Sequence, residues 1–337
     1  MTGRQSVHND SSMMPLIPDF TGNSAMSVLI CGSLAFDNIM VFQDRFKNHI
    51  LPDKIHILNV SFLVPELRRE FGGCAGNIAY NLKLLGGAPL IMGTVGVDFA
   101  PYASWMKSHA IDTRCITTID GALTAQAFIT TDLDDNQISA FHPGAMNFSA
   151  NNVVADAGAV TLGIIAPDGR DGMLAHARQM HEAGIPFIFD PGQGMPMFSG
   201  DDLKAFIDIA TWVTVNDYES ELMQERTGWS LEAIAERVEA CIVTLGAKGS
   251  TIYTRQERFD IPTAKPAKVT DPTGCGDAYR AGLLYGLVNK LPWATTGRIA
   301  SLLGAIKIAH AGTQNHHFTR DAFAALYAAE FGVKLNW

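Results

Sequence analysis

Short apolar runs rich in β-branched residues alternate with amphipathic segments through most of the chain. The runs end in Gly, Pro, Asp or Asn and predict strands over 27–35, 89–96, 160–167, 185–192, 211–217 and 241–247. Apolar positions at helical spacing predict helices over 75–85, 98–109, 171–183, 201–209, 217–227 and 230–239. Strands that are apolar throughout and separated by helices indicate an α/β domain, with a mainly parallel sheet covered on both faces.

Two regions do not follow this alternation of strands and helices. Segments of alternating hydrophobicity without a helix occur within 38–64 and within 114–141, where a turn at 132–136 connects the last two segments. Such segments can pair into a small separate β-sheet that forms a lid over a site, or they can extend an edge of the main sheet. We expect the lid, formed by about 37–66 and 114–146.

Composition and charge narrow the choice of partners. The chain has 337 residues, is 47% hydrophobic and 18% charged, and carries a formal net charge of −9. That charge argues against nucleic acid and anionic membrane as partners. No apolar run reaches the length of about 18 residues that a membrane-spanning helix needs. Any anionic ligand must therefore be held by local donors.

The N-terminal segment and the cysteines point to the cytoplasm. Residues 1–25 lack a basic start followed by an apolar segment, so we expect a flexible extension rather than a secretory signal, ahead of a domain over 26–337. The five cysteines are widely spaced and form no CxxC pair, which indicates reduced thiols. The adjacent His316 and His317 are expected to be solvated rather than to bind zinc.

The polar residues that end the predicted strands are the first candidates for a site. In open α/β sheets, ligands bind beyond the carboxyl ends of the strands. Asp37, Asp190, Asn216 and Gly246 occupy such positions.

The stretch DPTGCGDAYRAGLL, residues 271–284, carries the strongest chemical signal. Gly274 and Gly276 allow the backbone N–H groups to turn towards an anion, and the helix that follows adds its partial positive charge. Asp277 places a carboxylate at the same helix start. The alternative is a tight turn in which Asp277 caps the helix.

Three further segments are candidates for ligand binding, and the first two also have a purely structural interpretation. In 66–87, Gly72, Gly73 and Gly76 precede a helix with Asn77 in its first turn; they allow a ligand to approach or serve only the helix geometry. Asn216 and Glu219 have capping-box spacing, whereas the functional alternative places Glu219 beside metal-bound phosphates. The strand and glycine turn of 244–249 suit a nucleotide. No Walker-type loop, GxGxxG after the first strand, HExxH or GxSxG occurs in the chain.

Four motifs together resemble the PfkB family of ribokinase-like carbohydrate and nucleoside kinases. FGGCAGNIAYNLKLLG is similar to the first family signature and DPTGCGDAYRAGLLYGL to the second. Asn216-x-x-Glu219 is similar to the family's N-x-x-E element, and TLGAKG to its nucleotide-binding turn. The motifs occur in the family's order, and the resemblance covers 27 to about 325. It implies a three-layer α/β/α fold with a small β-sheet lid.

The resemblance also implies ATP-dependent phosphorylation of an alcohol, with Mg²⁺. Asp277 would be the base, and the anion hole would be formed by the backbone of Gly274, Cys275 and Gly276. The residues that would hold the acceptor are Asp37, Gly72, Gly73 and Asn77. The residues that would hold ATP and, indirectly through Glu219, Mg²⁺ are Asn216, Glu219, Thr244, Gly246 and Gly249. Asp271 and Thr273 fall where many members bind a monovalent cation, so activation by K⁺ is a further implication.

The sequence variants around these motifs look most like nucleoside kinases, with adenosine as the expected acceptor. A buried apolar patch of Phe128, Phe141 and Met146 could stack on a base, although core packing is the alternative for any single aromatic. Cys275 and Arg280 depart from the usual second signature, and Arg280 is expected to be solvated. A sugar kinase of the same family and a catalytically silent nucleotide-binding protein remain as alternatives. The chain is expected to be a monomer or a homodimer.

Overall fold

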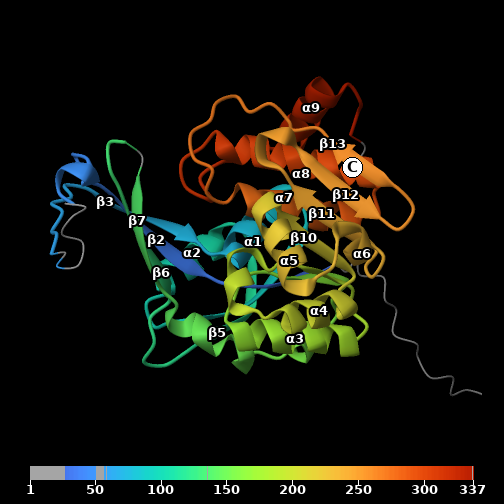
Figure 1. Ribbon diagram of the computed structural model, residues 1–337, viewed down its shortest axis with the longest axis horizontal. Helices are drawn as coiled ribbons and strands as arrows, with labels where there is room; N and C mark the ends of the chain where they lie inside the picture. The colour runs from blue at the N-terminus through green and yellow to red at the C-terminus, as the bar shows by residue number, and fades with distance from the viewer. Residues whose placement is uncertain (1–26, 51–56, 58, 135, 336) are drawn as a thin grey trace, which may run out of the picture.

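The computed structural model describes residues 27–50, 57, 59–134, 136–335 and 337, and it contains two β-sheets (Figure 1). The larger sheet has the strand order β13-β12-β11-β10-β9-β8-β1-β4-β5. Its strands are β1 (Ser27–Cys31), β4 (Ala88–Val95), β5 (Asp112–Thr118), β8 (Leu162–Ile165), β9 (Phe187–Phe189), β10 (Trp212–Asn216), β11 (Ala240–Thr244), β12 (Ser250–Thr254) and β13 (Arg258–Ile261). All neighbouring strands pair in parallel except β12, which is antiparallel to both of its neighbours.

Helices cover both faces of the larger sheet. They are α1 (Cys74–Leu84), α2 (Ala100–Ser108), α3 (Arg170–Glu182), α4 (Gly200–Ile209), α5 (Asp217–Thr227), α6 (Leu231–Ala235), α7 (Cys275–Val288), α8 (Trp293–Ile308) and α9 (Arg320–Phe331). Short 3₁₀ turns occur at Phe46–Asn48, Gly144–Asn151, Val154–Ala157, Gly192–Met197 and Gly246–Lys248. In Figure 1, α8 and α9 lie at the top of the molecule and α3 and α4 at the bottom.

The side chains of β1 show how the two cores form. Successive side chains of a strand point to opposite faces. Val28 and Ile30 pack in a core with residues of α1, α7, α8 and α9, while Leu29 and Cys31 pack in a second core with residues of α3 to α6. Burial on both faces explains why the strands are apolar throughout, and the predicted three-layer α/β/α fold is confirmed.

The smaller sheet has the order β3-β2-β6-β7 and lies to the left of the main body in Figure 1. It consists of β2 (Ala35–Val41), β3 (Leu67–Gly72), β6 (Ala125–Thr131) and β7 (Gln137–His142). β2 runs antiparallel to β3 and parallel to β6, and β6 runs antiparallel to β7. A second, smaller sheet was predicted, and the structure contains one.

Several boundaries differ from the prediction. The expected strand over 27–35 divides between the sheets, so that Asp37 lies in the smaller sheet rather than at the end of a main-sheet strand. The segment at 114–120 does not join the smaller sheet, because β5 follows α2 and pairs in parallel with β4, as a β-α-β crossover requires. The helix expected over 230–239 is α-helical only over Leu231–Ala235.

Some helices and strands of the structure have no counterpart in the prediction. Helices α8 and α9 and strands β3, β12 and β13 were not predicted. Residues 59–64, expected to belong to an alternating segment, form no strand. The expected N-terminal extension, 1–25, and residues 51–56 lie outside the described residues. Over the part of the chain that the structure describes, no helix is both long and apolar enough to cross a membrane.

Candidate active site

The start of α7 is an open helix N-terminus. Gly274 is the N-cap residue with φ 78°, and no side chain caps the helix. The Cys275 N–H donates to the Pro272 carbonyl at 3.1 Å. The N–H groups of Gly274 and Gly276 donate to no acceptor among the described residues. Two of the three N–H groups predicted for an anion hole are thus free, whereas that of Cys275 is already used in the turn.

Asp277 does not cap its helix. Its carboxylate Oδ2 accepts a hydrogen bond from the Asn77 side-chain amide at 2.8 Å. Burial raises the pKa of Asp277 to about 6, although the Asn77 hydrogen bond and Arg280 act in the opposite direction. A carboxylate with a pKa near neutrality, hydrogen-bonded and beside free N–H donors, has the properties of a general base. Asp277 and Asn77, 200 residues apart in the chain, therefore belong to one site.

A buried polar network fixes the Asn77 amide. Gln314 donates through Nε2 to Asn77 Oδ1 at 3.0 Å and to the Tyr102 hydroxyl at 2.6 Å. The Trp105 indole donates to Gln314 Oε1 at 3.0 Å, and the Tyr102 hydroxyl donates to the Gly72 carbonyl at 3.0 Å. Because the Asn77 oxygen faces an amide donor, its NH₂ group must face Asp277. Sequence reasoning missed Gln314 and Tyr102, which belong to no glycine motif or strand end.

The predicted acceptor residues meet where the two sheets join. A Cβ atom at Gly72 would lie 2.5 Å from Asp37 Oδ2, so only glycine allows this carboxylate to approach the backbone. Gly73 has φ 84°, and a Cβ there would lie 2.5 Å from the Ser33 carbonyl oxygen. Burial raises the pKa of Asp37 to about 6, with further contributions from the negative charges of Glu70 and Asp271. The glycines thus shape the backbone around Asp37, beside the α1 helix that carries Asn77.

The predicted ATP and Mg²⁺ residues lie at the carboxyl ends of β10 and β11. Asn216 and Glu219 form a complete capping box at the start of α5: Asn216 Oδ1 accepts from the Glu219 N–H at 2.7 Å, and Glu219 Oε2 accepts from the Asn216 N–H at 2.8 Å. Thr244 is the register partner of Asn216. Gly246 and Gly249 have φ 56° and 90°, and a Cβ at Gly249 would collide with the Ile261 carbonyl.

Arg280 of α7 faces Asp190 and Glu219 and is buried, contrary to the expectation that it is solvated. Its guanidinium forms two hydrogen bonds with the Asp190 carboxylate, at 3.0 and 2.9 Å, and lies 3.9 Å from Glu219 Oε2. A buried guanidinium is retained only with such a partner. Asp190 raises the pKa of Arg280 against the effect of burial. Arg280 lies one helical turn after Gly276 and Asp277, and this spacing could have indicated that it faces the same site.

Two other expectations are corrected by burial. His316 is fully buried, with Nε2 2.8 Å from Asn81 Oδ1, and burial lowers its pKa to about 3; only His317 is exposed. Phe128 and Phe141 are 42% and 54% exposed, so they form no buried patch. No group of three or more His, Cys, Asp or Glu residues able to hold a metal ion occurs within the described ranges.

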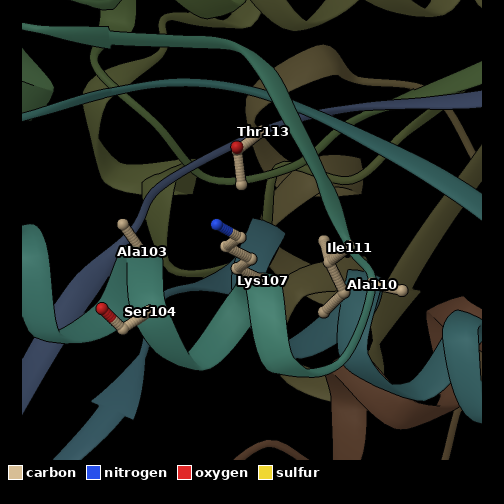
Figure 2. Close-up of a pocket in the computed structure, with 6 residues that line it drawn as sticks. All are labelled: Ala103, Ser104, Lys107, Ala110, Ile111 and Thr113. Atoms are coloured by element: carbon tan, nitrogen blue, oxygen red, sulfur yellow. The ribbon is translucent and has the colours of Figure 1, made fainter.

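A pocket of about 350 Å³ lies away from this site, at the end of α2 and the start of β5 (Figure 2). It is lined by Ala103, Ser104, Lys107, Ala110, Ile111 and Thr113. Lys107 is its only charged lining residue, and no predicted site residue lines it. This pocket is therefore separate from the predicted site residues.

The chain is similar to several known kinases. The nucleoside kinase of Burkholderia thailandensis, solved in complex with inosine, is 51% identical, with a TM-score of 0.84 over 91% of this chain and 99% of that chain. The nucleoside kinase of Methanocaldococcus jannaschii is 32% identical over 78% of this chain and 87% of its own length. A probable fructokinase of Arabidopsis thaliana is 26% identical over 67% of this chain and 71% of its own length.

The family model of pfkB family carbohydrate kinases matches residues 37–319. This span includes the open helix N-terminus, Asp277 and Asn77, the glycines predicted to hold the acceptor and the capping box of α5. The chain belongs to the pfkB family of carbohydrate kinases and is a phosphotransferase that acts on a hydroxyl group.

Proposed function

We propose that the protein transfers the γ-phosphoryl group of ATP to the 5′-hydroxyl of a nucleoside, with adenosine as the expected acceptor. The observation that carries the kinase chemistry is the hydrogen-bonded pair of Asp277 and Asn77 beside the free N–H groups of Gly274 and Gly276. The likeness to the inosine-bound B. thailandensis enzyme supports a nucleoside as acceptor. Inosine therefore belongs beside adenosine in any test.

In the proposed reaction, Asp277 accepts the proton of the attacking hydroxyl. The hydroxyl oxygen forms a bond to the γ-phosphorus, and the bond from that phosphorus to the bridging oxygen of ATP breaks, which leaves ADP. The N–H groups of Gly274 and Gly276, together with the dipole of α7, stabilise the negative charge on the transferring group. The hydrogen bond from Asn77 keeps the Asp277 carboxylate directed at the hydroxyl.

ATP is proposed to lie against Asn216, Thr244, Gly246 and Gly249. Mg²⁺ supplies charge neutralisation of the phosphates when it is bound with ATP. The donor set fits an ion carried mainly by the nucleotide and water, because Glu219 is already held by the Asn216 N–H. Its carboxylate would orient a metal-bound water, and Arg280 limits the negative charge that Glu219 and Asp190 create there.

The acceptor is proposed to lie along the face of the smaller sheet that carries Asp37. Asp37 is the register partner of Ala127 in β6, and Ala127 is the register partner of Phe141 in β7, so these three side chains share a face. Phe128 lies on the opposite face with Asn38. Two strand spacings separate Asp37 from Phe141, about 10 Å. A ribose held at Asp37 would thus bring its base to Phe141.

We further propose that the smaller sheet acts as a lid on the domain over 26–337. Exclusion of water from the site would limit ATP hydrolysis and strengthen the electrostatic interactions. All five cysteines are free thiols, which supports a cytoplasmic location.

The decisive experiment is an acceptor panel with ATP and Mg²⁺ that measures kcat/KM for adenosine, inosine, other nucleosides, ribose and fructose. We expect the highest kcat/KM with a purine nucleoside and a product phosphorylated at the 5′ position. Faster turnover on ribose or fructose than on every nucleoside would contradict the proposal and favour a sugar kinase. Binding of ATP without transfer to any acceptor would favour the silent nucleotide-binding protein.

The base contact has its own matched pair of variants. Phe141→Ala should raise KM for nucleosides by roughly tenfold, since stacking on a base contributes about 1–3 kcal/mol in comparable sites. Phe128→Ala, on the other face of the same sheet, should leave KM nearly unchanged. Equal effects of the two variants would argue against a base-binding role for Phe141.

A further inference from the structure

The ammonium of Lys307 is buried at the end of α8, next to the loop that leads into α7. Its side chain is fully inaccessible. Nζ donates to the Asp271 carbonyl at 2.7 Å and to the His310 carbonyl at 3.3 Å, and it lies 4.0 Å from Asp271 Oδ1. A lysine is almost never fully buried unless such partners hold it.

This ammonium packs against the loop that leads into α7, the helix whose start carries the free N–H groups. The Asp271 carbonyl that accepts from Lys307 also lies 3.9 Å from Cys275 Sγ. Gly304, three residues before Lys307 on α8, is so close to α7 that a Cβ there would lie 3.7 Å from the Cys275 carbonyl oxygen. The positive charge of Lys307 is therefore linked to Cys275, at the helix start, through the single carbonyl of Asp271.

The same oxygens are the ones that a monovalent cation would need. K⁺ is held in proteins by several carbonyl and carboxylate oxygens. Here Asp271 Oδ1 accepts from the Thr273 N–H and Oδ2 from the Gly312 N–H, both at 2.9 Å, and the Asp271 carbonyl accepts from Lys307. The Lys307 ammonium thus already occupies the side of Asp271 that a free cation would need, because it binds the Asp271 carbonyl and lies 4.0 Å from Oδ1. An ammonium carries the same single charge and binds the same kind of oxygen.

We propose that Lys307 is a built-in monovalent cation beside the anion hole, and that the enzyme therefore needs no K⁺. The proposal rests on the kinase function proposed above. Lys307 is a positioning residue: it joins the 270–273 and 310–312 loops through their carbonyls and adds a fixed positive charge behind the N–H donors. Burial lowers the pKa of Lys307, while Asp271, Cys275 and Asp277 oppose this effect, which is consistent with electrostatic coupling to the site.

The first test is a titration of the wild-type enzyme with KCl against NaCl at constant ionic strength, with kcat for the best nucleoside as the readout. We expect kcat to change by less than about twofold. Activation by K⁺ of about fivefold or more would overturn the inference. It would leave the proposed function intact, because the nucleoside would still be phosphorylated; absence of transfer to any acceptor would instead contradict the function itself.

The second test is Lys307→Ala, with Lys204→Ala on α4 as the control for loss of a lysine far from the site. We expect kcat to fall by roughly 10–100-fold with little change in KM for the nucleoside. Ammonium, methylammonium or K⁺ should restore part of the lost kcat, whereas tetramethylammonium, which has no N–H donor, should not. A folded variant that keeps full kcat, or that no small cation restores, would overturn the proposal. The titration of the wild type decides the question if the variant does not fold.

Discussion

Two helices of this protein begin in opposite ways, although both carry an acidic residue in the first turn. At α5 the side chains of Asn216 and Glu219 bind each other's backbone N–H groups and close the helix start. At α7 a glycine in the left-handed region takes the N-cap position, no side chain caps the helix, and Asp277 turns to Asn77 instead. A closed start stabilises the helix, whereas an open start keeps donors free for a phosphoryl group.

An acidic residue near a helix start therefore has no fixed role. Glu219 is in part a structural residue, because it completes a capping box. Asp277 satisfies none of the orphan N–H groups of its helix and is held by an amide from α1. What distinguishes the two is the partner of the carboxylate, which depends on tertiary contacts rather than on local spacing.

Loss of the carboxylate at the open start should have the largest effect. We expect Asp277→Asn to lower kcat by at least about 100-fold while ATP binding stays nearly intact, because the base is lost but the shape is kept. Steady-state kinetics together with nucleotide titration calorimetry would measure both quantities. Asp217→Asn, in the first turn of the closed helix, is the control and should leave kcat unchanged. Unaltered kcat in Asp277→Asn would remove this residue from the mechanism.

A side chain that crowds the open start of α7 should have the next largest effect on kcat. Gly274 has φ 78°, and a Cβ there would lie 3.1 Å from the Thr313 Cγ2 atom, so Gly274→Ala must disturb the N–H donors. We expect kcat to fall by roughly 10–100-fold. Gly228, which ends α5 with φ 69° and has open space around it, is the control. Gly228→Ala should cost about 1 kcal/mol of stability in thermal unfolding without lowering kcat. Equal kcat values in the two variants would contradict the role of Gly274.

Two substitutions of Glu219 separate its structural role at the start of α5 from its proposed role in binding Mg²⁺. Glu219→Ala should cost about 1 kcal/mol of stability through loss of the capping box. Glu219→Gln retains an oxygen acceptor and should keep most of that stability, yet it should raise the Mg²⁺ concentration needed for half-maximal rate by roughly tenfold. Asp202→Ala in the capping box of α4 should lower stability alone. If Glu219→Gln matches the wild type at every Mg²⁺ concentration, the role of Glu219 is only structural.

The smallest expected effect is on the acid limb of the pH profile. Burial raises the pKa of Asp277 to about 6, so the base form is lost, and kcat/KM falls, as the pH drops through that value. The Asn77 hydrogen bond acts to lower this pKa. Asn77→Ala should therefore move the acid limb to higher pH, besides any loss of acceptor binding.

Asp37 has a pKa raised to about the same value, so its protonation would contribute to the same limb. The profile of an Asp37→Asn variant would separate the two groups. An acid limb that is unmoved in Asn77→Ala would contradict the assignment of the limb to Asp277.

Much of this architecture could be read from local patterns. The apolar strands, the helices between them and the glycine turns each depend on residues close together in the chain, and the predicted helix over 217–227 matches α5 to the residue. Edge strands are harder to predict. The pattern of 114–120 is typical of a meander, but β5 belongs to the main sheet because it follows α2 and pairs in parallel with β4. The exposure of single side chains could not be predicted from the sequence either: Phe141 is exposed and His316 is buried.

The layered fold, the family and the candidates Asp277, Asn77, Asn216 and Glu219 could be inferred from the amino-acid sequence, because glycine turns and strand ends are local signals. How these residues are held depends on contacts that form only in the folded chain. It pairs Arg280 with Asp190 across 90 positions, brings Gln314 to Asn77 across 237, and places Lys307 on Asp271 across 36. Polar and charged groups that leave water must find partners, and in a folded chain these partners come from wherever the backbone passes.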